Sequence, residues 1–246
     1  MVPGSFSVHF TGNHFDSPLS FYVYRSFFDA LALKHSLPPA ILQMQGMSGQ
    51  RYRMFVNNLV RLMGKARYLE VGSWLGSTAC SAMWGNTAQV TCIDNWTQFG
   101  GPKDAFLKNT EITKSNCDLR FIESDFRLVD FSALGPCNVY LFDGPHEEAD
   151  QYDGVTYAYS ALAEEFVLIV DDFNWKAVRS GTRRAANDLN LLEVFSIEIR
   201  TSQDDSQPVD FFMENSDWHN GYYIGVFRKI PSTPKGNPPL FQGAQK

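Results

Sequence analysis

The regular alternation of short apolar runs with stretches of helical length constrains the fold of this chain more than any other feature of its sequence. The apolar runs are rich in β-branched and aromatic residues and lie at residues 66–71, 89–93, 119–123, 139–142, 166–170, 193–199 and 222–228. Between them, residues 76–84, 102–114, 147–163 and 178–190 have the length and pattern of helices. This alternation is typical of a mostly parallel α/β sheet with helices on both of its faces.

The two ends of the chain differ from this central pattern. The last two apolar runs are joined by the polar segment 201–220 instead of a helix, so we expect them to pair as antiparallel strands at the sheet edge. Residues 19–33 and 49–62 carry apolar residues at helical spacing. We therefore predict a helical extension over residues 1–64 packed on the core, an α/β domain over 65–230, and a Pro/Gly-rich surface tail over 231–246.

Charge and composition exclude several classes of partner. A formal net charge of -6 repels polyanions, and no basic stripe is interleaved with aromatic residues, so neither nucleic acid nor an anionic membrane is expected as a partner. No apolar stretch approaches the roughly 20 residues that span a bilayer, and the N-terminus has no signal pattern, which predicts a cytoplasmic protein. The four cysteines lie far apart without a C-x-x-C pair, so we expect reduced, mostly buried thiols.

A glycine-rich turn follows the first predicted strand. Its potential ligand-binding residues are Glu70, Gly72, Ser73, Trp74, Gly76 and Thr78. Glycines allow a tight turn and let the N–H groups at the start of the next helix face a ligand, although any strand-to-helix turn favours glycine. A dinucleotide fingerprint has the spacing G-x-G-x-x-G, whereas three residues separate the two glycines here, and Trp74 is too bulky to lie against a pyrophosphate. The turn therefore favours a different ligand.

Acidic and aromatic residues follow the second and third predicted strands. Asp94 lies about twenty residues after the glycines, where a carboxylate can accept two hydrogen bonds from a ribose, and it is followed by Asn95 and Trp96. Taken alone, Asp94 is equally suited to capping the next turn. After the third strand, Asp125 can accept from an exocyclic amine, while Phe126 or Trp96 packs on a base. Together with the glycine turn, these residues predict a nucleoside site.

Over residues 66–228 the chain resembles the class I S-adenosylmethionine-dependent methyltransferases. In that family an E/D-x-G-x-x-x-G turn holds the methionine part of the cofactor, an acid at the end of the second strand holds the ribose, and an acid after the third reaches the adenine. The resemblance assigns these roles to Glu70, Gly72, Gly76, Asp94 and Asp125. We expect further cofactor contacts from the neighbouring residues Ser73, Trp74, Thr78, Asn95, Trp96 and Phe126, and from Asp143. It also implies a seven-stranded Rossmann-like sheet whose last strand is antiparallel.

Three aspartates follow the fourth and fifth predicted strands. Asp143 follows one strand, and Asp171 and Asp172 follow the next. If the two strand ends are adjacent, these carboxylates repel one another and a cation stabilises them. Oxygen ligands suit Mg²⁺, with Mn²⁺ or Ca²⁺ as substitutes, so we predict a metal site. The alternative is that the aspartates only cap a helix or shape a turn.

The three aspartates resemble the metal site of the macrocin-type and catechol-type O-methyltransferases. In both types an Asp after the fourth strand joins an Asp-Asp or Asp-Asn pair after the fifth. Macrocin-type enzymes have an acid where this chain has Pro145, and catechol-type enzymes have a Lys where it has His146. We therefore expect Asp143 and His146 to be catalytic, with His146 as the general base, because an imidazole can take the proton of a metal-bound hydroxyl. If His146 is instead a ligand, Lys176 or Asp172 is the alternative base.

The sequence thus predicts a Mg²⁺-dependent O-methyltransferase. The resemblance implies that its acceptor is a sugar or another small molecule with a hydroxyl, and a homo-oligomer remains possible. Two other classes stay open. In a metal-independent N- or carboxyl-methyltransferase the aspartates would bind an amine directly, and a nicotinamide-binding or non-catalytic protein could use the same Rossmann-like sheet.

Overall fold

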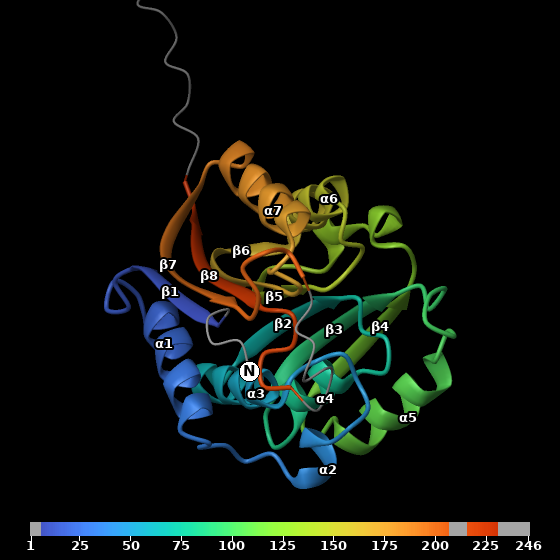
Figure 1. Ribbon diagram of the computed structural model, residues 1–246. Helices are drawn as coiled ribbons and strands as arrows, with labels where there is room; N and C mark the ends of the chain where they lie inside the picture. The colour runs from blue at the N-terminus through green and yellow to red at the C-terminus, as the bar shows by residue number, and fades with distance from the viewer. Residues whose placement is uncertain (1–5, 207–215, 231–246) are drawn as a thin grey trace, which may run out of the picture.

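An eight-stranded sheet forms the centre of the molecule in the computed structural model, which describes residues 6–206 and 216–230 (Figure 1). The strand order is β1-β7-β8-β6-β5-β2-β3-β4. The strands are β1 Ser7–Gly12, β2 Ala66–Val71, β3 Ala88–Asp94, β4 Asp118–Glu123, β5 Cys137–Phe142, β6 Leu162–Val170, β7 Leu191–Arg200 and β8 Tyr222–Lys229. The helices are α1 Pro18–Leu31, α2 Pro39–Leu42, α3 Gln50–Met63, α4 Ser77–Met83, α5 Lys103–Thr113, α6 Glu148–Ala158 and α7 Lys176–Asp188.

The central strands confirm the predicted parallel α/β sheet. β2 pairs in parallel with both β3 and β5, β3 pairs in parallel with β4, and β5 does so with β6. The helix predicted over residues 147–163 is shorter than expected, because α6 ends at Ala158 and β6 already begins at Leu162.

The predicted number of seven strands is wrong, because the N-terminal region adds an eighth. β1 pairs antiparallel with β7, in a register from Ser7 opposite Arg200 to Gly12 opposite Phe195. Five of the six residues of β1 are exposed and Val8 is half-buried. Val8 and Phe10 alternate with polar residues and contact the core and its aromatic rings, but this short run was not recognised as a strand. The region expected to be helical therefore begins with a strand.

The last strand is antiparallel, as predicted, but its expected place at the sheet edge is wrong. β8 lies between β6 and β7 and pairs antiparallel with both. Side chains from Tyr222 to Phe227 are buried, as expected of a strand with neighbours on both sides. β7 is not an edge strand either, because β1 covers it.

Side chains that alternate along the strands form a hydrophobic core on each face of the sheet. In β6, Val167 and Ile169 pack in the core that includes residues of α1, α3 and α4, whereas Leu168 and Val170 pack in the core beneath α6 and α7 (Figure 1). Burial on both faces explains why β6 ends in a continuous apolar run.

Three further expectations concern the rest of the chain. All four cysteines are free, and Cys80, Cys92 and Cys137 are buried, which confirms the prediction of reduced and mostly buried thiols. None of the helices within residues 6–206 and 216–230 is long and apolar enough to cross a membrane. The predicted tail at 231–246 lies outside the described residues.

Candidate functional site

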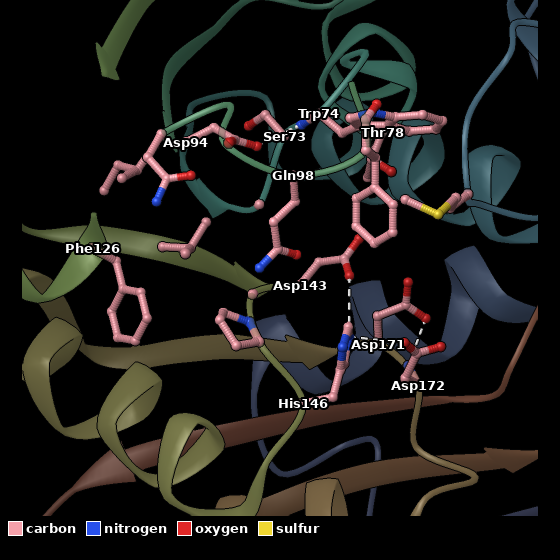
Figure 2. A pocket seen from close by; sticks show the side chains of 18 of the residues that line it. Ser73, Trp74, Thr78, Asp94, Gln98, Phe126, Asp143, His146, Asp171 and Asp172 are labelled. Atoms are coloured by element: carbon pink, nitrogen blue, oxygen red, sulfur yellow. Dashed lines mark hydrogen bonds and ion pairs between the residues drawn. The ribbon is translucent and has the colours of Figure 1, made fainter. Parts of the chain in front are cut away.

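A cavity of about 390 Å³ opens at the carboxyl ends of β2 to β6, where open α/β sheets bind their ligands (Figure 2). Most of the predicted site residues line it, namely Gly72, Ser73, Trp74, Thr78, Asp94, Asn95, Asp125, Phe126, Asp143, His146, Asp171 and Asp172. Glu70, Gly76 and Trp96 are not among its lining residues. The structure therefore brings both predicted halves of the site, the nucleoside residues and the aspartates, to one cavity.

Both glycines of the turn after β2 are required by the packing around them. Gly72 has a φ of +89°, and a Cβ atom there would lie 1.8 Å from the carbonyl oxygen of Asp143. Gly76 has a φ of +82°, and a Cβ atom there would lie 2.9 Å from the ring of Phe106. The close approach at Gly72 brings the turn against the end of β5. Packing therefore requires glycine here, in addition to the general preference of turns for this residue.

Asp94 holds together the turns after β2 and β3. Its Oδ2 accepts a hydrogen bond from the backbone N–H of Trp74 at 2.8 Å, and its Oδ1 accepts one from the N–H of Trp96 at 2.6 Å. Asp94 therefore does cap a turn, which was the alternative interpretation, and it also lines the cavity. A carboxylate has about four acceptor positions, so two remain for ligand hydroxyls.

Trp96 supports the glycine turn from outside the cavity. Its side chain is buried, and its indole N–H donates to the carbonyl oxygen of Trp74 at 2.9 Å. Its ring packs against Phe106, with ring centroids 5.0 Å apart. Of the two aromatic residues expected to pack on a base, only Phe126 therefore faces the cavity.

Glu70 lies beneath the turn, 1% exposed, and accepts a hydrogen bond from the hydroxyl of Tyr68. Burial raises the pKa of Glu70 to about 7, although the hydrogen bond from Tyr68 opposes this shift. The folded protein thus favours the protonated, neutral form of this side chain.

Replacing Glu70 by glutamine is expected to flatten the dependence of stability on pH. Because the folded-state pKa of about 7 exceeds the ordinary value of 4.5, folding takes up a proton between these values, and stability falls as pH rises through this window. When the pH is raised from 4 to 8, the unfolding free energy of Glu70→Gln should therefore increase by about 3 kcal/mol relative to that of the wild type. Urea unfolding at both pH values measures this difference. An identical pH slope in both proteins would contradict the assignment, and the exposed Glu111→Gln is the matched control.

At the other end of the cavity, Asp143, His146 and Asp172 form a compact cluster (Figure 2). His146 Nε2 lies 2.8 Å from Asp172 Oδ2 and 3.8 Å from Asp143 Oδ1. One possible metal-ligand atom from each of the three residues lies within 4.8 Å of the others. Asp171 is buried beside them, and its Oδ1 accepts a hydrogen bond from the backbone N–H of Asp172 at 2.7 Å.

The charges of this cluster depend on one another. Burial raises the pKa of Asp143 to about 6, and burial followed by the charge of Asp143 raises that of Asp171 well above its ordinary value. Burial alone would lower the pKa of His146, but its contacts with Asp143 and Asp172 outweigh burial and raise it to about 10. Burial would likewise raise the pKa of Asp172, and contact with His146 instead holds it low. His146 is therefore an imidazolium that balances the carboxylates.

Sequence reasoning missed several residues that line the cavity, among them Gln98 and His219. Gln98 follows β3 and extends its amide into the cavity (Figure 2). His219 comes from the polar segment before β8, and the buried Asn174 holds this segment in place through a hydrogen bond to Asn220 Oδ1 at 2.8 Å. No motif pointed to either residue, because their approach to the site depends on loops. Phe99 and Trp175 also line the cavity.

Comparison with known proteins supports the fold. No protein-family model and no curated protein matches the sequence. Among solved structures, cofactor-bound Rv0187 from MTB matches with a TM-score of 0.52 and 14% identity, over 87% of this chain and 92% of that one. A putative SAM-dependent methyltransferase from Streptococcus mutans matches with a TM-score of 0.50 and 12% identity, over 73% and 48%. TrmN from Thermus thermophilus matches with a TM-score of 0.47 and 16% identity, over 84% and 53%.

The two matches with TM-scores of 0.50 and 0.52 establish a shared fold. The chain spans about half the length of the Streptococcus mutans protein and of TrmN. Structures that match with TM-scores below 0.5 include O-methyltransferases and a putative RNA methyltransferase, and similarity this slight does not distinguish between acceptors. The chain therefore has a Rossmann-like fold that is also found in S-adenosylmethionine-dependent methyltransferases.

Proposed function

We propose that this protein is an S-adenosylmethionine-dependent methyltransferase that methylates a hydroxyl group of a small molecule with the help of a divalent metal ion. The observation that carries the proposal is the single cavity whose two ends differ in chemistry. Asp94, Asp125 and Phe126 lie towards one end, and the cluster of Asp143, His146 and Asp172 lies at the other. A nucleoside cofactor and an acceptor bound at these ends would meet beside Asp143.

The cofactor end has the groups that an S-adenosyl nucleoside needs. Two backbone N–H donors fix the carboxylate of Asp94, which leaves acceptor positions for the ribose hydroxyls. Asp125 accepts from the backbone N–H of Arg127 at 2.9 Å and also faces the cavity, where it can accept from the adenine amine. Phe126 offers an apolar ring to the base. Gly72 leaves room for the methionine part beside the start of α4.

The acidic end fits a hard divalent cation. Asp143, Asp171 and Asp172 all line the cavity, and the buried Oδ1 of Asp172 has no hydrogen-bond partner among the described residues. A buried carboxylate oxygen without a partner is costly, and Mg²⁺ prefers such oxygen ligands. We propose these three aspartates as the metal ligands. When bound, the metal would lower the pKa of the acceptor hydroxyl.

His146 remains our proposed general base. Paired with Asp172 and Asp143, it carries the positive charge that balances them, and an imidazolium cannot accept a proton. A cation held by the aspartates would take over that charge and leave the imidazole neutral. The alternative is that His146 itself is a ligand, in line with its place in the cluster. Lys176 or Asp172 would then be the base.

The acceptor site is proposed to lie beside Trp175. Its ring meets the imidazole of His146 edge to face, with ring centroids 5.1 Å apart, and forms an apolar wall next to the carboxylates. A sugar or glycoside suits such a wall, because its hydroxyls can reach the acidic cluster while its C–H face packs on the indole. The net charge of -6 favours a small molecule over nucleic acid.

We also propose that residues 1–64 are an extension of a cofactor-binding domain at 65–230.

Replacing Asp94 by alanine is expected to weaken the binding of S-adenosylhomocysteine by about 1.5 to 3 kcal/mol, the usual value of hydrogen bonds to a charged group. Titration calorimetry would show a roughly ten- to hundredfold higher Kd. Glu123→Ala, at the exposed end of β4, is the matched control. Unchanged affinity in a folded Asp94→Ala protein would remove Asp94 from the ribose site.

Calorimetry on the wild-type protein tests the function as a whole. S-adenosylhomocysteine should bind and NAD should not, and after treatment with a chelator added Mg²⁺ should give a separate binding signal. Binding of NAD alone would favour an oxidoreductase. Methyl transfer that persists fully in the chelator would favour the metal-independent class of methyltransferase, in which the aspartates bind an amine.

A further inference from the structure

Arg53, in α3, is completely buried and donates hydrogen bonds to the loop that precedes its own helix. Its Nε donates to Ser48 Oγ at 2.9 Å, its Nη1 to the carbonyl oxygens of Ile41 at 3.0 Å, Leu42 at 3.1 Å and Met44 at 2.6 Å, and its Nη2 to that of Gly46 at 3.3 Å. One side chain therefore holds the end of α2 and three residues of the loop over residues 43–49, namely Met44, Gly46 and Ser48.

This loop is pressed against the start of α4, beside the cavity. A Cβ atom on Gly46 would lie 2.1 Å from Ser77 Oγ, and the hydroxyls of Ser48 and Ser77 are 3.0 Å apart. From this position Met47 lines the cavity, together with Ser77 and Thr78. The loop thus covers the α4 end of the pocket.

A second segment packs against the end of the loop and the first turn of α3, where a Cβ atom on Gly49 would lie 2.3 Å from the carbonyl oxygen of Asp217. The N–H of Gln50 donates to the carbonyl oxygen of Ser216 at 2.7 Å, and the N–H of Tyr52 donates to that of Asp217 at 3.2 Å. Arg51 Nε also lies 2.8 Å from Asp217 Oδ2. Because this segment carries His219 to the cavity, Met47 and His219 belong to one connected wall.

We propose that Arg53 is a positioning residue that fixes Met47 as a wall of the cofactor pocket, an inference that rests on the proposed function. A buried guanidinium costs desolvation energy, and an apolar side chain of similar volume could fill the same space in α3 without that cost. What an apolar residue cannot do is hold several carbonyl oxygens of an irregular loop at once. A loop ordered before the ligand arrives loses less conformational freedom on binding, so the cofactor binds more tightly.

The test compares Arg53→Leu, Arg53→Lys and a matched control, Arg67→Leu. Arg67 also donates to a backbone carbonyl, that of Gly135 at 2.7 Å, but it lies near the start of β2, away from the cavity. Calorimetry with S-adenosylhomocysteine should show a ten- to hundredfold higher Kd for Arg53→Leu and a smaller change for Arg53→Lys, which keeps some donors. Arg67→Leu should bind as the wild type does, whatever its loss of stability.

A spectroscopic signature separates positioning from simple destabilisation. With ¹³C-methyl methionine, Met47→Leu identifies the Met47 signal among the seven methionines. S-adenosylhomocysteine should shift this signal in the wild type, and Arg53→Leu should broaden it before any ligand is added. If Arg53→Leu does not fold, Ser48→Ala, which removes the hydroxyl between Arg53 and Ser77, should give a weaker effect of the same kind.

Three results would overturn the inference. They are wild-type affinity in folded Arg53→Leu, a sharp and unshifted Met47 signal in that variant, or equal losses of affinity in Arg53→Leu and Arg67→Leu. Failure of the wild type to bind S-adenosylhomocysteine would instead contradict the proposed function. The Met47 signal without ligand would still report whether Arg53 orders the loop.

Discussion

Asp172→Asn is expected to lower methyl transfer at least about a hundredfold while the affinity for S-adenosylhomocysteine stays nearly unchanged. The change removes a charged oxygen ligand from the proposed metal site but keeps the shape of the side chain. Asp172 lies at the acidic end of the cavity, whereas Asp94 and Asp125 would hold most of the nucleoside. Activity should partly recover at high Mg²⁺ concentration, because mass action offsets the weaker site.

The measurement is the release of S-adenosylhomocysteine with a panel of sugar nucleotides, glycosides and catechols, across a series of Mg²⁺ concentrations. His146→Ala is the informative comparison. Loss of a base lowers turnover at every Mg²⁺ concentration, whereas loss of a ligand shifts the Mg²⁺ requirement. Undiminished turnover in Asp172→Asn would remove this aspartate from the metal site, and a shifted requirement in His146→Ala would identify the histidine as a ligand.

Gly72→Ala is expected to destabilise the protein by about 2 to 5 kcal/mol and to abolish detectable binding of S-adenosylhomocysteine. Two costs add up at this position. The φ of +89° is unfavourable for alanine, and its methyl group would overlap the carbonyl oxygen of Asp143. To relieve this overlap, the end of β5 must move away from the turn. This movement would also separate the two halves of the site.

Gly85→Ala separates the two costs. Gly85 has a φ of +68°, but a Cβ atom there would meet nothing within 4 Å, so only the backbone term of about 1 to 2 kcal/mol applies. Urea unfolding of both variants gives the difference. Equal losses of stability would show that the approach of Asp143 to Gly72 is unimportant.

Most of the central sheet could be predicted because β2, β3, β5 and β6 are largely buried. These strands therefore contain apolar residues that single-sequence analysis detects, as in the run from Phe166 to Val170. The edge strand β4 is mostly exposed and was detected through Leu119, Phe121 and Ile122. β1 escaped detection because its alternating apolar residues, Val8 and Phe10, form only a short run, and its pairing with the distant β7 leaves no local signal. The insertion of β8 between β6 and β7 could not be predicted either, because no local pattern indicates which strands will pair.

In the site, too, features with a local sequence signal could be predicted and long-range contacts could not. Asp94, Asp143 and Asp172 follow strands directly, so their common position at one edge of the sheet could be inferred from strand order alone. Their detailed roles could not, because the contact between His146 and Asp172 depends on turn geometry, including a positive φ of 53° at Asp172. His219 reaches the cavity through a segment that Asn174 holds in place, and no local pattern predicts this contact.

The position of β8 also determines the order in which this protein can be assembled during synthesis. β6 and β7 leave the ribosome before β8, yet β8 separates them in the finished sheet, and β1 has only β7 as its neighbour. β1 can therefore join the complete sheet only after nearly the whole chain has been synthesised. In contrast, β2, β3 and β4 can pair as soon as they leave the ribosome. A nascent chain that stops before residue 222 has the cofactor half of the cavity but lacks the strand that completes the sheet behind Asp171 and Asp172. Because the pairing of β1 with β7 joins residues as far apart as Ser7 and Arg200, we expect it to form late in folding, and until then the edge of β7 is open to aggregation.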